Sequence, residues 1–218
     1  MLTLSLGDEH APLEVLLIGA HADDIEIGCG ATVMQLARSR PLTCHWIVLS
    51  GCDERAAEAA ASARAFGAEA VQLDVRVESF PESYLPYCGR ELKDYVQALA
   101  NEISPDIVFT HHGGDFHQDH RIVAELCWNA FRNHLVLEYE VPKYDGDLGR
   151  PNVFVGVEAS MKARKIELLM SAFPSQGERY WYTEETFEAL LRLRGVEARA
   201  PSGYAEAFFA RKVNLLLG

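Results

Sequence analysis

Short apolar runs alternate with longer amphipathic stretches over the first two thirds of the chain. Short apolar runs predict buried strands, and apolar residues that recur every three or four positions predict helices. The predicted strands are Leu13–Ile18, Cys44–Ser50, Ala70–Leu73 and Ile107–Thr110. The predicted helices are Gly28–Ser39 after a glycine-rich turn, Asp53–Phe66 with Asp53 as N-cap, Arg90–Glu102, and a helix over about Arg121–Asn133.

This alternation predicts an α/β fold, because parallel strands are joined by crossovers that a helix usually supplies. We expect a Rossmann-like, three-layer fold around a mostly parallel central sheet with the strand order 3-2-1-4. The loops after the first and fourth strands then face each other at the topological switch point. In sheets of this kind, ligands bind at that point.

The final third of the chain is less regular. Its patterns predict strands at Val136–Glu140 and Val153–Val157, helices at Met161–Ser171 and Thr183–Arg194, and a packed apolar tail at Asn214–Gly218. No linker or internal repeat interrupts the sequence. We therefore expect residues 1–218 to form one domain with an irregular α/β C-terminal part.

Charge and composition exclude several classes of protein. The 218 residues carry a formal net charge of −12, which disfavours nucleic acids and anionic membrane surfaces as partners. No apolar stretch has the length of a membrane span, and the N-terminus lacks the features of a signal peptide, so we expect a cytoplasmic protein. The five cysteines form no CxxC pair, which argues against a disulfide framework or a thiolate metal site. The acidic surface and the apolar tail are compatible with a homo-oligomer.

Two polar motifs follow the first and fourth predicted strands, at Ala20–Asp24 and Asp115–His120. Catalytic zinc takes three protein ligands from His, Asp and Glu and leaves one position open. We therefore expect His21, Asp24 and His120 to bind one zinc ion and to lower the pKa of the water it holds. Two imidazoles and a carboxylate also accept iron, cobalt or manganese.

The remaining side chains of both motifs suit acid–base chemistry. Asp23 adjoins a predicted ligand and is a candidate general base. His117 can act as a protonated donor to the reacting carbonyl or to the leaving amine. Asp119 could hold His117 in the manner of an Asp–His pair. Asp115 could serve the same orienting role or bind substrate.

Simpler interpretations of the same residues remain open. Asp is a common helix N-cap, so Asp24 or Asp23 could serve only as a cap. The Gly28–Thr32 segment is a rival phosphate-binding turn, but Val33 stands where the fingerprint has its third glycine. His111 and His112 are the histidines of the second motif's loop that we least expect to take part.

Ala20–Thr32, with the sequence AHADDIEIGCGAT, resembles the first signature of the PIG-L/LmbE-type zinc deacetylases, roughly AHPDDExxGCGGT. His117–His120 resembles the second signature of that family, His-x-Asp-His, and Ser202–Phe208 resembles its closing segment. The chain departs from the family pattern at Ala22, where Pro is usual, and at Ile25, where Glu is usual. Neither departure removes a predicted ligand.

The resemblance implies zinc-dependent removal of the N-acetyl group from an N-acetylglucosamine-type or related acetamido sugar conjugate. Carried over residue by residue, the zinc ligands are His21, Asp24 and His120, the general base is Asp23, and the carbonyl-polarising pair is His117 and Asp119. Arg55 matches a family position associated with substrate contact. Two alternatives stay open: an amidohydrolase acting on a non-sugar N-acyl amine, and a catalytically silent metal- or nucleotide-binding module.

Overall fold

A computed structural model describes residues 3–8 and 10–214 of the chain. The strands are β1 (Leu13–Gly19), β2 (Leu42–Val48), β3 (Gln72–Val77), β4 (Ile107–His111), β5 (Leu135–Tyr139), β6 (Val153–Gly156) and β7 (Ala205–Phe209). The α-helices are α1 (Asp24–Ser39), α2 (Asp53–Phe66), α3 (Gly89–Glu102), α4 (Gln118–Ala130), α5 (Ala159–Ala172) and α6 (Glu184–Ala198). Two short 3-10 helices are η1 (Leu85–Cys88) and η2 (Pro174–Gln176).

The strands form one sheet with the order β3-β2-β1-β4-β5-β7-β6. Strands β1 to β5 pair in parallel, whereas β7 pairs antiparallel with both β5 and β6. The α/β class and the order 3-2-1-4 are therefore confirmed. Strand β1 lies between two parallel neighbours, and nearly all of its residues are buried. That burial explains its continuous apolar run, because a central parallel strand is covered on both faces.

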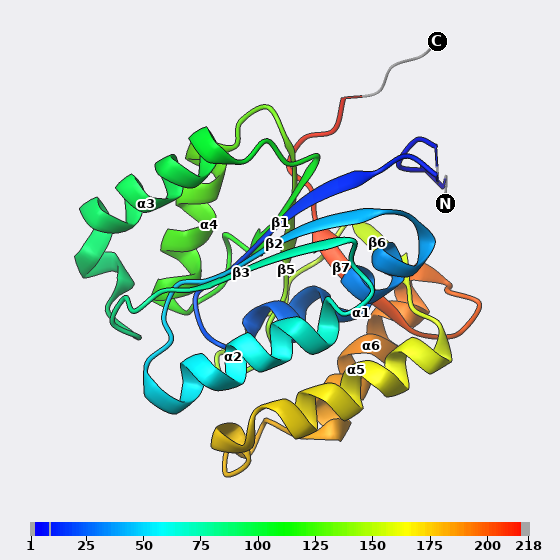
Figure 1. Ribbon diagram of the computed structural model, residues 1–218. Coiled ribbons are helices and arrows are strands. Elements are labelled where there is room, and N and C mark those ends of the chain that lie inside the picture. The colour runs from blue at the N-terminus through cyan, green and yellow to red at the C-terminus, as the bar shows by residue number, and fades with distance from the viewer. Residues whose placement is uncertain (1–2, 9, 215–218) are drawn as a thin grey trace.

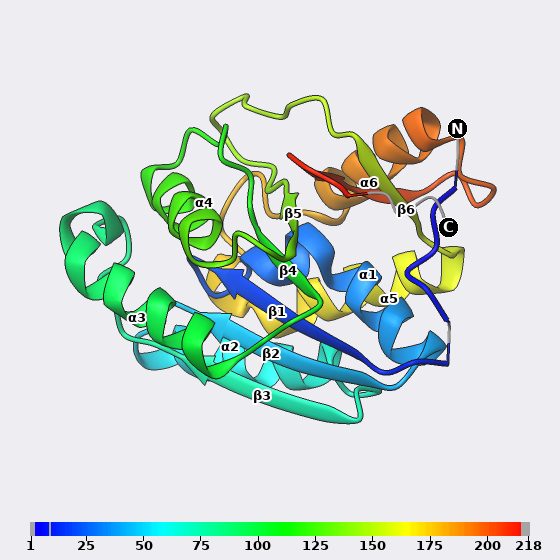
Figure 2. The same cartoon turned by 90° about the horizontal axis from the view of Figure 1, so that it is seen from above.

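The helices form layers on the two faces of the sheet. Helices α3 and α4 cover one face, and α1 and α2 cover the other, with α5 packed over α1 and α2 (Figure 1). Helix α6 packs against β6, β7 and α5, beside the outer strands (Figure 2). Helix α3 shows how the pattern produces this layer, since Leu92, Val96 and Leu99 recur on one face and are its buried residues. Within the described residues, no helix combines the length and apolarity needed to cross a membrane.

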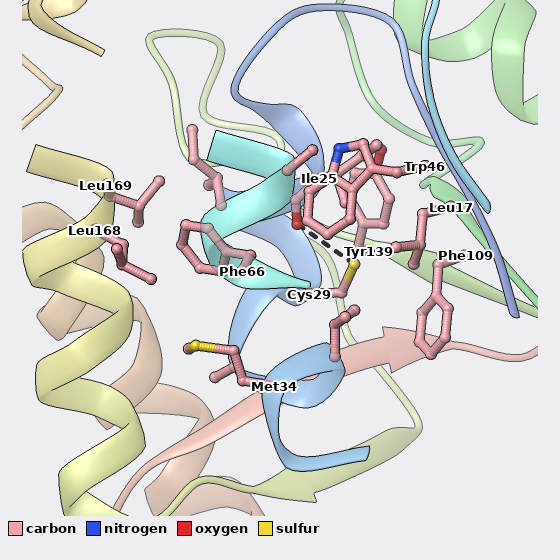
Figure 3. Close-up of a cluster of buried hydrophobic side chains, with 14 of the residues drawn as sticks. Leu17, Ile25, Cys29, Met34, Trp46, Phe66, Phe109, Tyr139, Leu168 and Leu169 are labelled. Atoms are coloured by element: carbon pink, nitrogen blue, oxygen red, sulfur yellow. Dashed lines mark hydrogen bonds between the residues drawn. The ribbon is translucent and has the colours of Figure 1, made fainter. Parts of the chain in front are cut away.

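Helix α1 begins one turn before the predicted start, so the expected glycine-rich turn at Gly28 is wrong. The glycines lie inside the helix because other elements pack closely against it. A Cβ atom on Gly28 would lie 2.2 Å from the Tyr139 ring, and one on Gly30 would lie 2.6 Å from the Phe66 ring. Both rings belong to the buried cluster around α1 (Figure 3). These glycines therefore allow the Tyr139 and Phe66 rings to pack directly against α1.

The bounds of the other predicted elements differ from those in the structure by at most four residues at either end. Helix α2 has the predicted bounds, but its N-cap position is Cys52 and Asp53 is its first residue. Strand β3 is displaced from Ala70–Leu73 to Gln72–Val77, because this edge strand carries polar residues that break the apolar run. Strand β7 was not predicted. The expected packing of the tail lies outside the described residues beyond Asn214.

No disulfide links the five cysteines. All five are free thiols. Cys29, Cys44 and Cys127 are buried packing residues, whereas Cys52 is exposed.

Candidate functional site

The loops after β1 and β4 meet at the carboxyl ends of these adjacent strands. They line a pocket of about 230 Å³ that includes His21, Asp23, Asp24, His117 and His120. Four further segments complete the wall. They are the start of α2 at Arg55, the loop after β3 at Glu82, the loop after β5 at Val141, Lys143, Tyr144 and Asp145, and the segment between α5 and α6 at Gln176, Arg179 and Trp181. The structure thus brings the two sequence motifs together at the switch point, as expected.

The donor atoms of the three predicted metal ligands converge. His21 Nδ1 lies 3.1 Å from His120 Nε2 and 3.2 Å from Asp24 Oδ2. His120 Nε2 lies 3.4 Å from Asp24 Oδ1. In a tetrahedral site with metal–ligand bonds of about 2.0–2.1 Å, neighbouring ligand atoms lie about 3.3 Å apart. The spacing of these three side chains therefore suits a small divalent metal ion.

A carboxylate holds the outer nitrogen of each ligand imidazole. Asp115 Oδ2 lies 2.9 Å from His120 Nδ1, and Asp119 Oδ2 lies 3.1 Å from His21 Nε2. These contacts direct His120 Nε2 and His21 Nδ1 towards Asp24. Metal-binding histidines almost always have such a partner on the second nitrogen, which fixes the tautomer and the ring orientation. The two carboxylates thus support the metal-binding interpretation of both rings.

The expected role of Asp119 as the holder of His117 needs correction. The Asp119 carboxylate contacts His21 and accepts hydrogen bonds from the backbone N–H groups of Ser83 and Leu85. Asp119 supports His117 only through its backbone N–H, which donates to His117 Nδ1 at 3.2 Å. His117 is the N-cap of α4, so one residue of the second polar motif also caps the helix. This bond occupies Nδ1 as an acceptor and leaves Nε2 of a neutral His117 ring as an N–H donor.

Asp115 has contacts that fit the orienting alternative. It is buried, and its Oδ2 atom also accepts from Lys143 Nζ at 2.8 Å. Lys143 lines the pocket and also pairs with Asp147 at 2.8 Å. The Lys143 charge and the hydrogen bond from His120 lower the pKa of Asp115 against the opposing effect of burial. Lys143 lies in a polar turn without a recognisable motif, so the sequence pattern did not predict its place in the site.

His111 is the second residue that the sequence analysis missed. It is fully buried, and its ring stacks on His120 with 3.9 Å between the centroids. Its Nε2 atom accepts a hydrogen bond from the Ala20 N–H at 2.9 Å and so holds the first motif. His112 turns away from the site and contacts Glu138, as expected of a residue that takes no part. The alternation of side chains along a strand could have distinguished His111 from His112, because adjacent residues at the end of β4 face opposite sides of the sheet.

Other trios of donors also occur in this cluster. His21, His117 and His120 offer nitrogen atoms within 4.8 Å of one another, and so do the donor atoms of Asp24, His111 and His120. His117 Nδ1 and His111 Nε2 already accept backbone hydrogen bonds. In the trio His21, Asp24 and His120, the two converging nitrogen atoms accept no backbone hydrogen bond in the described structure. Asp24 Oδ2 accepts one, from the His21 N–H.

Asp23 lines the pocket beside the ligand trio and is 5% exposed. Burial and the charge of Asp24 raise its pKa to about 6, against the opposing charge of Arg55. Arg55 Nη2 lies 3.4 Å from Asp23 Oδ1, and Arg55 Nη1 pairs with Glu82 at 2.7 Å. Asp23 also stands at the N-cap position of α1 but makes no side-chain cap bond. The cap-only interpretation of Asp23 is therefore wrong.

The negative groups of the site favour positive charge at its centre. Burial opposes an imidazolium at His21, yet the charge of Asp24 and the hydrogen bond to Asp119 raise the pKa of His21 to about 10. The pKa of His117 is lowered, because burial and the neighbouring charges of His120 and His21 disfavour its cationic form. The same field that favours a proton on His21 attracts a metal cation to the ligand trio.

The aromatic residues of the C-terminal third divide between the pocket and the core. Tyr144 and Trp181 line the pocket. Tyr139, Phe173 and Tyr182 are buried in the core, and Tyr180 is 89% exposed. A larger groove of about 1220 Å³ lies beside the second half of α1, and its lining includes none of these aromatic residues and none of the motif residues. The chemistry-bearing side chains thus gather in the smaller pocket.

Comparison with known proteins agrees with this arrangement. Residues 16–131 match the family model described as PIG-L: GlcNAc-PI de-N-acetylase. The chain is also similar to an uncharacterized deacetylase, YaiS, of Escherichia coli (strain K12). The two sequences are 31% identical over 144 residues, and the aligned segment covers 59% of this chain and 74% of the relative.

Two solved structures show that the fold supports more than one chemistry. N,N'-diacetylchitobiose deacetylase from Pyrococcus horikoshii has a TM-score of 0.66 and 22% identity, covering 90% of this chain and 83% of that one. GalB, the 4-carboxy-2-hydroxymuconate hydratase from Pseudomonas putida KT2440, has a TM-score of 0.71 and 17% identity, covering 94% and 99%. At these identities the likeness concerns the fold, so the activity has to be argued from the site. The family match covers both polar motifs, and the chain belongs to the PIG-L family.

Proposed function

We propose that this protein is a zinc-dependent hydrolase that removes the N-acetyl group from an N-acetylglucosamine-type or related acetamido sugar conjugate. The observation that carries the proposal is the convergence of three side chains that line the pocket: His21 Nδ1 and His120 Nε2 lie 3.1 Å apart, and each lies 3.2–3.4 Å from one of the two Asp24 carboxylate oxygens. Family membership and the deacetylase relative support the same chemistry.

The ligand set fits zinc better than the alternatives. Two imidazole nitrogens and one carboxylate oxygen are typical of catalytic zinc, and a fourth position stays open. When bound, zinc acts as a Lewis acid that polarises a carbonyl and lowers the pKa of water. The chain would hold the ion through His21, Asp24 and His120, with Asp119 and Asp115 fixing the two rings.

Two other pocket residues, Asp23 and His117, serve the proton transfers of amide hydrolysis. Asp23 accepts a proton from the attacking water as a new C–O bond forms at the amide carbonyl. His117 donates a hydrogen bond from Nε2 to the carbonyl oxygen as negative charge develops there. The C–N bond then breaks, and Asp23 or His117 gives the amine its proton. The products are acetate and the free amine.

The outer part of the pocket supports a polar substrate with an apolar face. Arg55, on the first turn of α2, is partly held by Glu82 and can contact a hydroxyl or carbonyl of the substrate. Trp181 and Tyr144 line the same opening and offer flat apolar surfaces. Sugars have both hydroxyl groups and apolar C–H faces, so this combination favours an acetamido sugar over a purely aliphatic acyl amine.

The direct test is the release of acetate from a panel of N-acetylglucosaminyl compounds, with metal-stripped protein before and after zinc is restored. The panel includes the free sugar, a sugar nucleotide, a glycolipid mimic and a thiol-precursor glycoside. We expect zinc-dependent acetate release from at least one member. A non-sugar N-acetyl amine is assayed beside the panel, and acetate from it alone would replace the sugar substrate by a non-sugar amide. No acetate from any compound, with zinc bound stoichiometrically, would overturn the proposed activity.

A further inference from the structure

We propose that the buried ion pair between Lys165 and Glu206 positions the metal-binding end of α1. This inference rests on the metal centre of the proposed function. Lys165 comes from α5 and Glu206 from β7, and the two side chains are 3% and 2% exposed. Lys165 Nζ lies 2.6 Å from Glu206 Oε1. Neither residue lines the pocket, so the pair acts on the site only through another element.

The two side chains of the ion pair form hydrogen bonds with backbone groups of α1. In a regular α-helix the Ala31 N–H donates to the carbonyl of Ile27, four residues earlier. Here the Ile27 carbonyl accepts from Lys165 Nζ at 2.6 Å, and the Ala31 N–H donates to Glu206 Oε1 at 2.9 Å. Lys165 and Glu206 thus connect, through their side chains, the two backbone groups that a regular helix joins directly.

Glu206 also provides a cap for the second part of α1. Its Oε2 atom accepts from the Thr32 N–H at 2.7 Å, so one carboxylate binds two successive backbone N–H groups. Two successive N–H groups that donate to one side-chain carboxylate are typical of a helix N-terminus. Side chains inserted into a helix ladder are a known cause of bending. The ion pair therefore joins α1 at the boundary between its first turn, residues 24–27, and the part that begins at Ala31, within one helix that runs from Asp24 to Ser39.

The first turn of α1 carries the residues that matter for the site. It begins with the proposed ligand Asp24 and directly follows Asp23. The Ile27 N–H donates to the Asp23 carbonyl at 3.1 Å, and the Ile27 carbonyl accepts from Lys165. One helical turn thus connects the hydrogen bond of Lys165 to Asp23 in the pocket. The direction of this turn decides where the Asp24 carboxylate points.

The middle of α1 has little freedom to compensate for a lost ion pair. Gly28 packs against the Tyr139 ring and Gly30 against the Phe66 ring, with no room for a Cβ atom. A buried ion pair is a weak source of stability, because both ions lose their hydration. Apolar side chains of similar volume would fill the same space and leave the Ile27–Ala31 bond free to form. These properties favour a positioning role over a purely stabilising one.

The test uses cobalt(II) as a spectroscopic probe of the metal site in the full chain. In Glu206→Gln, an amide NH₂ group replaces one of the two acceptor oxygens, so the side chain can no longer serve both N–H groups and Lys165. Glu140→Gln is the matched control, because Glu140 is also buried and pairs with Arg194 at 2.7 Å away from the ladder of α1. We expect Glu206→Gln to weaken cobalt binding by about tenfold or more and to change the visible absorption spectrum. We expect Glu140→Gln to leave both unchanged.

A double variant keeps the test decisive if Glu206→Gln fails to fold. Lys165→Met/Glu206→Met leaves no buried charge and allows Ile27 and Ala31 to bond directly. An altered cobalt spectrum in the folded double variant would support the proposal. Cobalt affinity and spectrum like those of the unmodified protein, in either variant, would overturn it. A crystal structure of the unmodified protein with a direct Ile27–Ala31 hydrogen bond would also overturn it. If the unmodified protein itself binds no cobalt, the metal centre of the proposed function fails, and this inference fails with it.

Discussion

Asp115 and His120 lie five residues apart on either side of the α4 N-terminus, with Oδ2 and Nδ1 2.9 Å apart. This contact turns the other nitrogen of His120 towards Asp24 and His21. The aspartate also contacts Lys143, so the loop after β5 is tied to the same point. One carboxylate thus couples a proposed metal ligand to a wall of the pocket.

The Asp115→Ala variant should therefore bind zinc more weakly, by about 10- to 100-fold, because partners of this kind orient the ligand and raise its basicity. Competition with a chromophoric chelator measures the affinity. Asp147→Ala is the control, since Asp147 also pairs with Lys143 and its carboxylate also accepts a backbone N–H, from Phe116. Equal losses of zinc affinity in the two variants would show that Lys143, and not the orientation of His120, sets the affinity.

Asp23→Asn should separate metal binding from catalysis. The amide cannot accept the proton of the attacking water, so we expect kcat to fall by about 10²- to 10⁴-fold with unchanged zinc content. Acetate release and metal analysis on the same preparation measure both quantities. Glu82→Gln removes another carboxylate from Arg55 in the same pocket and should lower kcat far less. Near-full activity of Asp23→Asn would show that a different group is the base.

Gly28→Ala should destabilise the fold, although alanine is the better helix former. Its Cβ atom would lie 2.2 Å from the ring of Tyr139, whose hydroxyl donates to the Ile18 carbonyl at 2.8 Å. Overpacking of this kind costs about 1–3 kcal/mol of unfolding free energy. Gly89→Ala, at the start of α3 with nothing within 4 Å, should change stability by less than about 1 kcal/mol. Urea unfolding of both variants checks the contrast, and equal effects would contradict it.

Glu138 should make the stability of the protein sensitive to acid. Its carboxylate is 1% exposed, accepts from His112, Gly113 and Trp128, and pairs with Arg211. Burial alone would raise its pKa, but these partners lower it below the ordinary 4.5. A carboxyl with a lowered folded-state pKa stabilises the fold above its unfolded-state pKa. This contribution is lost as the pH falls through the folded-state value.

The unfolding free energy should therefore fall as the pH drops below about 4.5, and it should fall more steeply in the unmodified protein than in Glu138→Gln. Urea titrations over the range from about pH 6 to about pH 3 measure the two slopes. Other buried carboxylates add to the acid sensitivity of both proteins, so the difference between the slopes is the informative quantity. Parallel slopes would mean that Glu138 keeps the same pKa in the unfolded chain.

The sequence predicted those parts of the fold that are decided by local pattern. The buried run of β1 and the amphipathic period of α3 are visible in one segment, and both strands that carry motifs were placed correctly. The predicted start of α1 was wrong because Gly28 and Gly30, taken from the sequence alone, indicate a turn. In the structure these positions need glycine because the rings of Tyr139 and Phe66, far away in the sequence, pack directly against them.

The same distinction applies to the site. The types and spacing of His21, Asp24 and His120 were enough to predict that they converge. The sequence does not reveal which nitrogen each carboxylate holds, because that depends on how two loops approach each other. Asp119 was therefore assigned to His117, its neighbour in sequence, although its carboxylate contacts His21. Lys165 and Glu206 carry no motif, since their partners are backbone atoms of α1.

The position of β7 has a consequence for biosynthesis. This strand is made after β6 and α6, yet it lies between β5 and β6 in the sheet. Strands β1 to β5 pair with one another without β7, but within the described residues β6 pairs only with β7, so its pairing waits until residues 205–209 have been synthesised. Because Glu206 lies on this strand, a chain truncated before it would lack the carboxylate that accepts from the Ala31 and Thr32 N–H groups.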